Sequence, residues 1–585
     1  MTANDAAKQV ASLLIDWCDA LLRLQIRQPE NPRLDGALLC SACGTVHGRC
    51  HEAVYPLLCA ARLTGNNDYL DAAKRLFRWG EQMLCADGGC RNDFNADWKG
   101  VTVFAAIALH DALFYHGDLL CAKERAAWED RLSAMGRWLY ENLTLQMPAY
   151  LNYYAANACA MALLGGYFSN DAYRARAKEL AAYCMDHVSK NGLIFGEGRP
   201  NNAVSPKGCR AIDVGGYNVE ESLPSLCRYA AISGDKQTLE TCCALWRAHL
   251  HWMLPDGAWD NSTGTRAFKW TYWGSRTADG CQAALFALGK DDPVFAEAAW
   301  RNFELYRACT HNGLLTGGPD YQKNGEPPCV HHTFCHAKVL AGSIDGGIPA
   351  FPRVALLSDH PQPLRYYPEL DTYQLASGKW RMDVCGYDFA YRGEKHISGG
   401  CVTLLWQADF GAVIAAGLSD QTLLEPHNQQ PSVHPETWRS GCPRLETLGS
   451  MPVYGQQYCD SAVLSANGSE TDPTVRAAGC LSSKEGTLLP GGEYAIEYRL
   501  SENGLLVSGS VDPALAERVC FVLPLIEETA AVNLLQGALL SAPERCFNLC
   551  PGFLCKEYRI APDQAGRLRF RIFIPEAENK DTFSA

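Results

Sequence analysis

Five segments of the chain are dense in polar and aromatic side chains, in contrast to the apolar stretches around them. They hold histidine, tyrosine, arginine and asparagine close together. They span residues 47–52, 152–157, 197–202 with 213–221, 260–276 and 331–338. Tyr and His transfer protons when they lie within hydrogen-bond reach of a reacting atom, and Arg side chains bind anions. These residue types indicate a site that moves protons on an anionic substrate.

Two histidine pairs have helical spacing. His332 and His336 stand four residues apart and share one face of any helix there. This spacing suits a metal pair, but a zinc-protease motif requires Glu directly after the first His, where this chain has Thr333. His51 stands four residues after His47 and has Tyr55 where such a motif needs its second His. We predict a catalytic role for His332 and substrate contacts for His51 and His336.

A single CxxC motif, Cys40 to Cys43, raises the alternative of a zinc site. Four ligands are needed for such a site, and His47 and Cys50 are the nearby residues that could complete it. One isolated CxxC is a weak signal. We therefore predict neither a metal nor a cofactor.

The segment 259–276 combines cations with a high density of aromatic residues. Its aromatic side chains could form a stacking platform for sugar rings, and they are Trp259, Trp270, Tyr272 and Trp273. The predicted anion-binding cations of this segment and of the preceding loop are Arg199, Arg266, Lys269 and Arg276. The structural alternatives are a packed aromatic core and ordinary salt bridges.

Helical hairpins must position these segments. Apolar residues recur at helical spacing through the first 350 residues, and Gly/Asn/Asp turns begin near residues 65, 117, 169, 234 and 289. A repeat of about 50 residues, with two helices in each repeat, predicts about six helical hairpins before residue 350. They could form an open solenoid or a closed double ring, and we favour the ring because its long loops would converge at one end.

The last third of the chain changes to a period of two. Clean alternation at 567–574, and the Asn503-Gly504 turn between apolar runs, predict antiparallel strands and hairpins. We predict an α+β multidomain protein: an (α/α) toroid over residues 1–350, a linker over 351–370 and an antiparallel β-sandwich over 371–585. The Pro-rich loop with His427, His434 and Arg439 is expected to reach the cleft from the β domain.

Composition narrows the partners and the location. The net charge of −13 argues against nucleic acid, because no broad basic face is available to neutralise phosphates. Neither a secretory signal nor a membrane-spanning run is recognisable, and 27 scattered cysteines suit a reducing compartment. We expect a cytoplasmic protein without a membrane partner; a homo-oligomer is compatible with the sequence.

The architecture and two motifs resemble known lyases. A helical toroid followed by a β-sandwich is similar to the heparinase II/III-like lyases and to the rhamnose–glucuronate lyases. In these lyases an Asn starts a mid-toroid helix, as Asn152 does here, and a Tyr follows a Gly-rich turn before a Glu-bearing helix, as Tyr217 does. The usual heparinase pattern has His directly after the Asn, where this chain has Tyr153.

The resemblance implies β-elimination at a 4-linked uronic acid within an oligosaccharide. The enzyme must neutralise the uronate carboxylate, remove the adjacent proton and protonate the leaving oxygen. The predicted catalytic residues are Asn152, Tyr217, Arg276 and His332.

Three alternatives stay open from the residues alone: an epimerase that uses the same proton chemistry, a helical-repeat binding scaffold, and a toroid glycoside hydrolase such as an unsaturated glucuronyl hydrolase. The hydrolase would need two carboxyl groups. The acids that could supply them are Glu197, Asp213, Glu220, Asp256 and Asp260.

Overall fold

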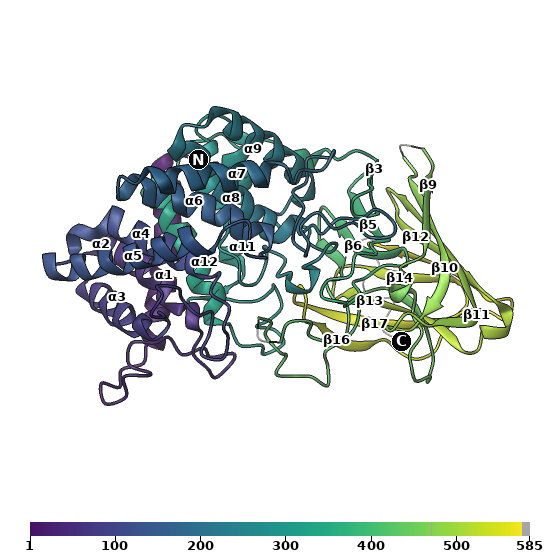
Figure 1. The fold of residues 1–585 in the computed structure, drawn as a ribbon. Helices are drawn as coiled ribbons and strands as arrows, with labels where there is room; N and C mark the ends of the chain where they lie inside the picture. Colours follow the sequence, from purple (N-terminus) through teal and green to yellow (C-terminus); the bar gives the residue numbers. More distant parts are fainter. Residues whose placement is uncertain (427, 470, 576–585) are drawn as a thin grey trace.

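A helical half precedes an antiparallel β half along the chain. The structure is a computed structural model that describes residues 1–426, 428–469 and 471–575. Figure 1 shows the helices, purple to teal, beside the β-sheets, green to yellow. The predicted α+β organisation is confirmed. Among the described residues, no helix has both the length and the apolar character needed to cross a membrane.

Six helices form an inner ring. They contact one another in the order α2, α4, α6, α8, α10, α12, and α12 returns to α2. α4 and α6 are buried around most of their circumference, which explains their apolar composition without a polar face. The inner helices are α2 (Val54–Thr64), α4 (Thr102–His116), α6 (Leu151–Tyr167), α8 (Leu223–Ser233), α10 (Gln282–Leu288) and α12 (Val330–Gly346).

A second layer of helices surrounds this ring. α3, α5, α7, α9 and α11 each pair with the inner helix that precedes them, whereas α1 packs against α12, so the first and last helices form the sixth pair. The prediction of a closed ring of about six helical pairs is confirmed. The outer helices are α1 (Ala3–Leu24), α3 (Asn67–Trp79), α5 (Ala122–Asn142), α7 (Asp171–Met185), α9 (Lys236–His249) and α11 (Pro293–Ala308).

Two of the five predicted turns, at residues 65 and 234, both end one helix with a left-handed glycine and cap the next. Gly65 and Gly234 are left-handed, with φ of 69° and 70°, directly after α2 and α8. The side chains of Asn66, Asn170 and Asp235 accept hydrogen bonds from the first-turn amides of α3, α7 and α9.

Three antiparallel sheets make up the β half. One has the order β3-β4-β5-β6-β7, the second β14-β18-β12-β11-β10-β9, and the third β15-β17-β13-β8 with β16 also paired to β17. Strands of all three contribute to one apolar core, as Met382, Ile496 and Phe521 illustrate. The strands are β3 (Leu364–Tyr367), β4 (Thr372–Ser377), β5 (Trp380–Cys385), β6 (Cys401–Gln407), β7 (Gly411–Ala415), β8 (Arg444–Thr447), β9 (Val463–Asn467), β10 (Thr474–Ser482), β11 (Leu488–Ser501), β12 (Gly504–Val511), β13 (Val519–Ile526), β14 (Ala531–Gln536), β15 (Ala538–Leu539), β16 (Glu544–Asn548), β17 (Phe553–Ala561) and β18 (Arg567–Phe573).

The β-hairpins predicted from the sequence occur in the structure at the expected positions. β11 and β12 pair through Ser501 and Gly504, so the turn residues are Glu502 and Asn503, and β6 pairs with β7. Strand β3 begins inside the segment expected to be a linker, because Leu364–Tyr367 pairs with β4. Helix α12 ends at Gly346 and β3 begins at Leu364, so the connection between the two halves spans residues 347–363.

Candidate active site

A cavity of about 1400 Å³ opens where the loops before the inner helices meet the β half. Arg49, Phe104, Asn152, Tyr217 and His332 line it from segments at or just before the N-terminal ends of inner helices. The β half closes one side with Arg392, Glu425, Pro426 and Asn428 to Pro431. Its volume exceeds that of ordinary small-molecule pockets, so several sugar rings fit.

Seven residues predicted for catalysis or substrate binding line this cavity. They are Asn152, Arg199, Tyr217, Arg266, Lys269, Arg276 and His332. Among the Pro-rich loop residues, His434 and Arg439 do not contribute to the lining, and His427 lies outside the described residues.

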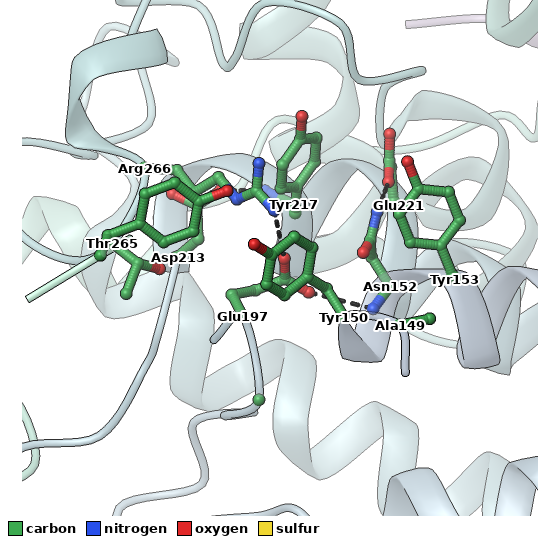
Figure 2. Close-up of polar contacts among 12 residues, drawn as sticks. Ala149, Tyr150, Asn152, Tyr153, Glu197, Asp213, Tyr217, Glu221, Thr265 and Arg266 are labelled. Atoms are coloured by element: carbon green, nitrogen blue, oxygen red, sulfur yellow. Dashed lines mark hydrogen bonds and ion pairs between the residues drawn. The ribbon is translucent and has the colours of Figure 1, made fainter. Parts of the chain in front are cut away.

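Asn152 is fixed by two glutamates at the start of α6. Its backbone N–H donates to Glu197 Oε1 at 3.0 Å, and its side-chain Nδ2 donates to Glu221 Oε2 at 2.5 Å (Figure 2). Burial raises the pKa of Glu197 to about 7, and burial together with Asp279 raises the pKa of Glu221 well above its ordinary range. Glu221 and Asn152 line the cavity, so an uncharged carboxyl group stands beside an amide.

Tyr217 sits in a distorted helical turn, Val214–Ser222, that leads into α8. Asp213 Oδ2 accepts the Tyr217 N–H at 2.7 Å, and Gly216 has non-helical φ and ψ of −120° and −109°. A Cβ on Gly216 would lie 2.4 Å from Asp213 Oδ2, and one on Gly215 would lie 2.6 Å from the Asp260 carbonyl oxygen. The two glycines therefore permit the turn that presents Tyr217.

The Tyr217 hydroxyl is held among polar groups. It lies 2.8 Å from Thr277 Oγ1 and accepts a hydrogen bond from Lys269 Nζ at 3.1 Å. Lys269 also pairs with Glu425 Oε2 at 2.6 Å. Burial raises the pKa of Tyr217 above its ordinary value, although the nearby Arg266 guanidinium opposes this. Tyr217 is therefore protonated at neutral pH.

Arg266 lies among aromatic rings from distant parts of the sequence, so these contacts were not predictable from the sequence. Its guanidinium carbon is 4.4 Å from the Tyr217 ring centre and 4.8 Å from that of Tyr150, and its Nη2 pairs with Glu197 Oε2 at 3.3 Å (Figure 2). Such cation–π contacts between buried groups place a fixed positive charge beside both phenols.

Tyr150 is a cavity residue that sequence reasoning missed. Burial alone would raise the pKa of its phenol, but hydrogen bonding with Tyr391 and Arg392 and the charge of Arg266 lower that pKa below its ordinary value. The Arg392 Nε donates to Tyr150 OH at 3.3 Å. The sequence signal was the position of Tyr150 directly before the Asn152 segment, but Arg392 comes from the β half.

Arg276 and His332 form another part of the lining. Arg276 donates to the Tyr321 hydroxyl, and His332 Nδ1 has no hydrogen-bond partner among the described residues. Burial and the charge of Arg276 lower the pKa of His332 well below its ordinary value, so the imidazole is neutral.

The predicted aromatic platform is wrong. Trp270, Tyr272 and Trp273 belong to the packed interior and do not line the cavity. Trp270 Nε1 donates to the Trp259 carbonyl at 2.7 Å, and Tyr272 OH donates to Asp256 at 2.6 Å. Their polar atoms are already satisfied inside the protein, so these side chains pack against other protein groups and not against substrate.

His336 and His51 are likewise placed in the interior. His336 is fully buried beside Trp273, with Nε2 3.4 Å from Glu220 Oε1, one turn below His332 on α12. His51 packs against Gly80, and burial lowers its pKa to about 4. The predicted substrate contacts of both residues are wrong, because neither lines the cavity. His336 lies one helical turn further along α12 than His332, among buried side chains, and the turn before α2 places His51 against Gly80.

The family relationship agrees with this geometry. Residues 14–355 match the ulvan lyase N-terminal domain and residues 364–538 match the ulvan lyase C-terminal domain. The chain is 36% identical over 532 residues to a broad-specificity ulvan lyase of Formosa agariphila, covering 88% of this chain and 82% of that one.

Two solved structures are similar at low sequence identity. A heparinase III is 10% identical with a TM-score of 0.46, covering 96% of this chain and 84% of the other. The heparan sulfate lyase HepC of Pedobacter heparinus is 9% identical with a TM-score of 0.42, covering 98% and 83%. From the two family models and the 36% identical relative, the chain belongs to the ulvan lyase family and is a polysaccharide lyase that cleaves uronic acid glycosides by β-elimination.

Proposed function

We propose that this lyase acts on uronic-acid-containing oligosaccharides derived from ulvan. The relative that is 36% identical is named a broad-specificity ulvan lyase, and the size of the cavity suits a segment of several sugars. The observation that carries the proposal is the pairing of Asn152 with an uncharged Glu221 beside two tyrosines whose pKa values are shifted in opposite directions.

Asn152 and Glu221 are proposed to bind the uronate carboxylate. β-Elimination builds negative charge on this group, and donors already in place stabilise it most effectively. A protonated Glu221 donates a hydrogen bond without adding a negative charge to the site. Arg266 and Lys269 supply positive charge on the neighbouring wall.

Tyr150 and Tyr217, two of the three tyrosines that line the cavity, are proposed to divide the proton transfers. Groups whose environments separate their pKa values are suited to opposite acid and base roles. Tyr150, with the lowered pKa, takes the proton next to the carboxylate; Tyr217, which stays protonated, delivers a proton to the leaving oxygen. His332 and Arg276 are proposed to contact substrate on the remaining wall.

A product assay tests this function. The enzyme is incubated with ulvan fragments, heparan sulfate fragments and a neutral oligosaccharide, and absorbance of a new 4,5-double bond is followed. We expect a rise with ulvan fragments. New reducing ends without absorbance would contradict elimination, and a rise with heparan sulfate fragments alone would contradict the substrate assignment.

We also propose a cytoplasmic location. The support is that all 27 cysteines are free thiols in the structure, a state that a reducing compartment maintains. Fractionation of cells that express the native gene, with antibody detection, tests it: recovery in the periplasmic or secreted fraction would contradict the proposal.

A further inference from the structure

Four soft-metal ligands meet in the wall of the cavity. They are Cys40, Cys43, His47 and Cys329, and one ligand atom from each lies within 4.8 Å of all the others. Cys40 and Cys329 are buried, and Cys43 and His47 are half-buried. Cys50, the neighbouring thiol considered from sequence, is not part of the group; the third thiol comes from a residue 289 positions away from Cys40.

The spacing of the ligand atoms matches a metal and not a disulfide. Cys40 Sγ lies 3.6 Å from Cys329 Sγ, and Cys329 Sγ lies 3.6 Å from His47 Nε2. A tetrahedron with bonds of about 2.3 Å to sulfur and about 2.0 Å to nitrogen has edges of about 3.5–3.8 Å. A disulfide would need its sulfur atoms about 2.0 Å apart.

The backbone is arranged to hold this group. Gly44, with φ of 64°, lets the loop turn so that its N–H donates to the Cys40 carbonyl at 2.9 Å, while Cys40 N–H donates to the Thr45 carbonyl at 2.8 Å. Ser41 Oγ donates to the Pro328 carbonyl at 2.9 Å and so ties the loop to the residue before Cys329. Cys329 is the N-cap of α12, where the helix dipole favours a thiolate.

We propose that Cys40, Cys43, His47 and Cys329 bind one structural Zn²⁺. Three thiolates and one imidazole complete a tetrahedron, which leaves no open position for substrate or water. On binding, three thiol protons leave to solvent, and the site carries a net charge of −1.

The ion would act as a positioning device for the active site. It joins the loop 40–47, which lines the cavity, to the start of α12, which carries His331 and His332 into the same cavity. The rings of His47 and His331 lie 5.3 Å apart, so the ligand loop contacts the helix directly. Loss of zinc should therefore loosen His332 without removing any group that touches the reacting atoms.

Metal content of the purified enzyme tests the proposal. Mass spectrometry of wild-type protein isolated without chelators should find about one zinc per chain. Cys40→Ser and Cys329→Ser should each lose it, whereas the matched controls Cys50→Ser and Cys85→Ser, whose thiols lie outside the group, should keep it. Zinc that survives both ligand substitutions would overturn the site.

A second measurement needs no variant and so avoids variants that fail to fold. Zinc K-edge absorption of wild-type enzyme should show three sulfur neighbours at about 2.3 Å and one nitrogen at about 2.0 Å. Titration with an organomercurial should release the zinc to a colour-forming chelator and lower the melting temperature. A metal-free protein that takes up neither Zn²⁺ nor Co²⁺, or a disulfide within the group after anaerobic purification, would refute the proposal.

Discussion

The cations and the aromatic residues of the segment 259–276 alternate in the sequence but lie in different places in the structure. Its cations reach the cavity, namely Arg266, Lys269 and Arg276. Its aromatic residues lie in the interior, namely Trp259, Trp270, Tyr272 and Trp273. The indole N–H groups of Trp270 and Trp273 and the Tyr272 hydroxyl find protein acceptors there. The cations instead lie beside acids and phenols at the cavity. We therefore expect substrate to be recognised by the charged groups of this segment and not by its aromatic rings.

The largest expected difference in activity is between removing the hydroxyl of a cavity tyrosine and removing that of an interior tyrosine. Tyr217→Phe removes the proposed proton donor and should lower kcat about 10³-fold, because acid–base groups typically contribute that much. Its melting temperature should stay nearly unchanged. Kinetics on ulvan fragments and thermal unfolding measure both.

The matched control is Tyr272→Phe. It leaves Asp256 without its 2.6 Å donor and should cost about 1 kcal/mol of stability while kcat stays close to wild type. Full activity in Tyr217→Phe, or inactivity of a stably folded Tyr272→Phe, would contradict the assignment of Tyr217 to catalysis and of Tyr272 to packing.

Substitutions of Lys269 and of its neighbour Trp270 should affect different properties, activity for the first and stability for the second. Lys269→Met removes the charge that contacts Tyr217 and Glu425, so kcat/KM should fall about 10²-fold. Trp270→Phe, which loses the bond to the Trp259 carbonyl, should lower stability by about 1–2 kcal/mol with kcat/KM retained. Equal activity losses at equal stability would show that both residues act in the same way.

Two histidines on α12 sharpen the comparison within one helix. His332→Gln should lower kcat/KM about tenfold, the value of one charged or polar contact to substrate. His336→Gln should mainly lower stability, because its ring packs on Trp273 and faces Glu220. Kinetics and denaturant unfolding distinguish the two, and a tenfold loss of activity confined to His336→Gln would contradict the cavity assignment.

The smallest effect concerns the pH profile. Arg392 helps to lower the pKa of Tyr150, so Arg392→Gln should raise that pKa. A base works in its deprotonated form, so the rising limb of kcat/KM should move to higher pH by about half to one unit, while the rate above the limb is retained. Arg381→Gln, outside the cavity, serves as the control. An unshifted limb would remove Tyr150 from the role of base.

The fold was predictable from local patterns, whereas half of the site depends on long-range packing. Glycine turns and the Asn503-Gly504 hairpin identified the ring and the sheets because these features act within a few residues. Asn152 and Tyr217 were recognisable from motifs at helix starts. Glu425 and Arg392 were not, because only docking of the β half brings them to Lys269 and Tyr150. His332 and His336 share one face of α12, and only His332, one turn nearer the start of the helix, reaches the cavity.

The most direct measurement is a crystal structure of the Tyr217→Phe enzyme with an ulvan oligosaccharide. Our account predicts a uronate carboxylate within hydrogen-bond distance of both Asn152 Nδ2 and Glu221, with the adjacent C–H directed at Tyr150. A carboxylate bound at Arg276 alone, with Asn152 and Glu221 free of substrate, would contradict it.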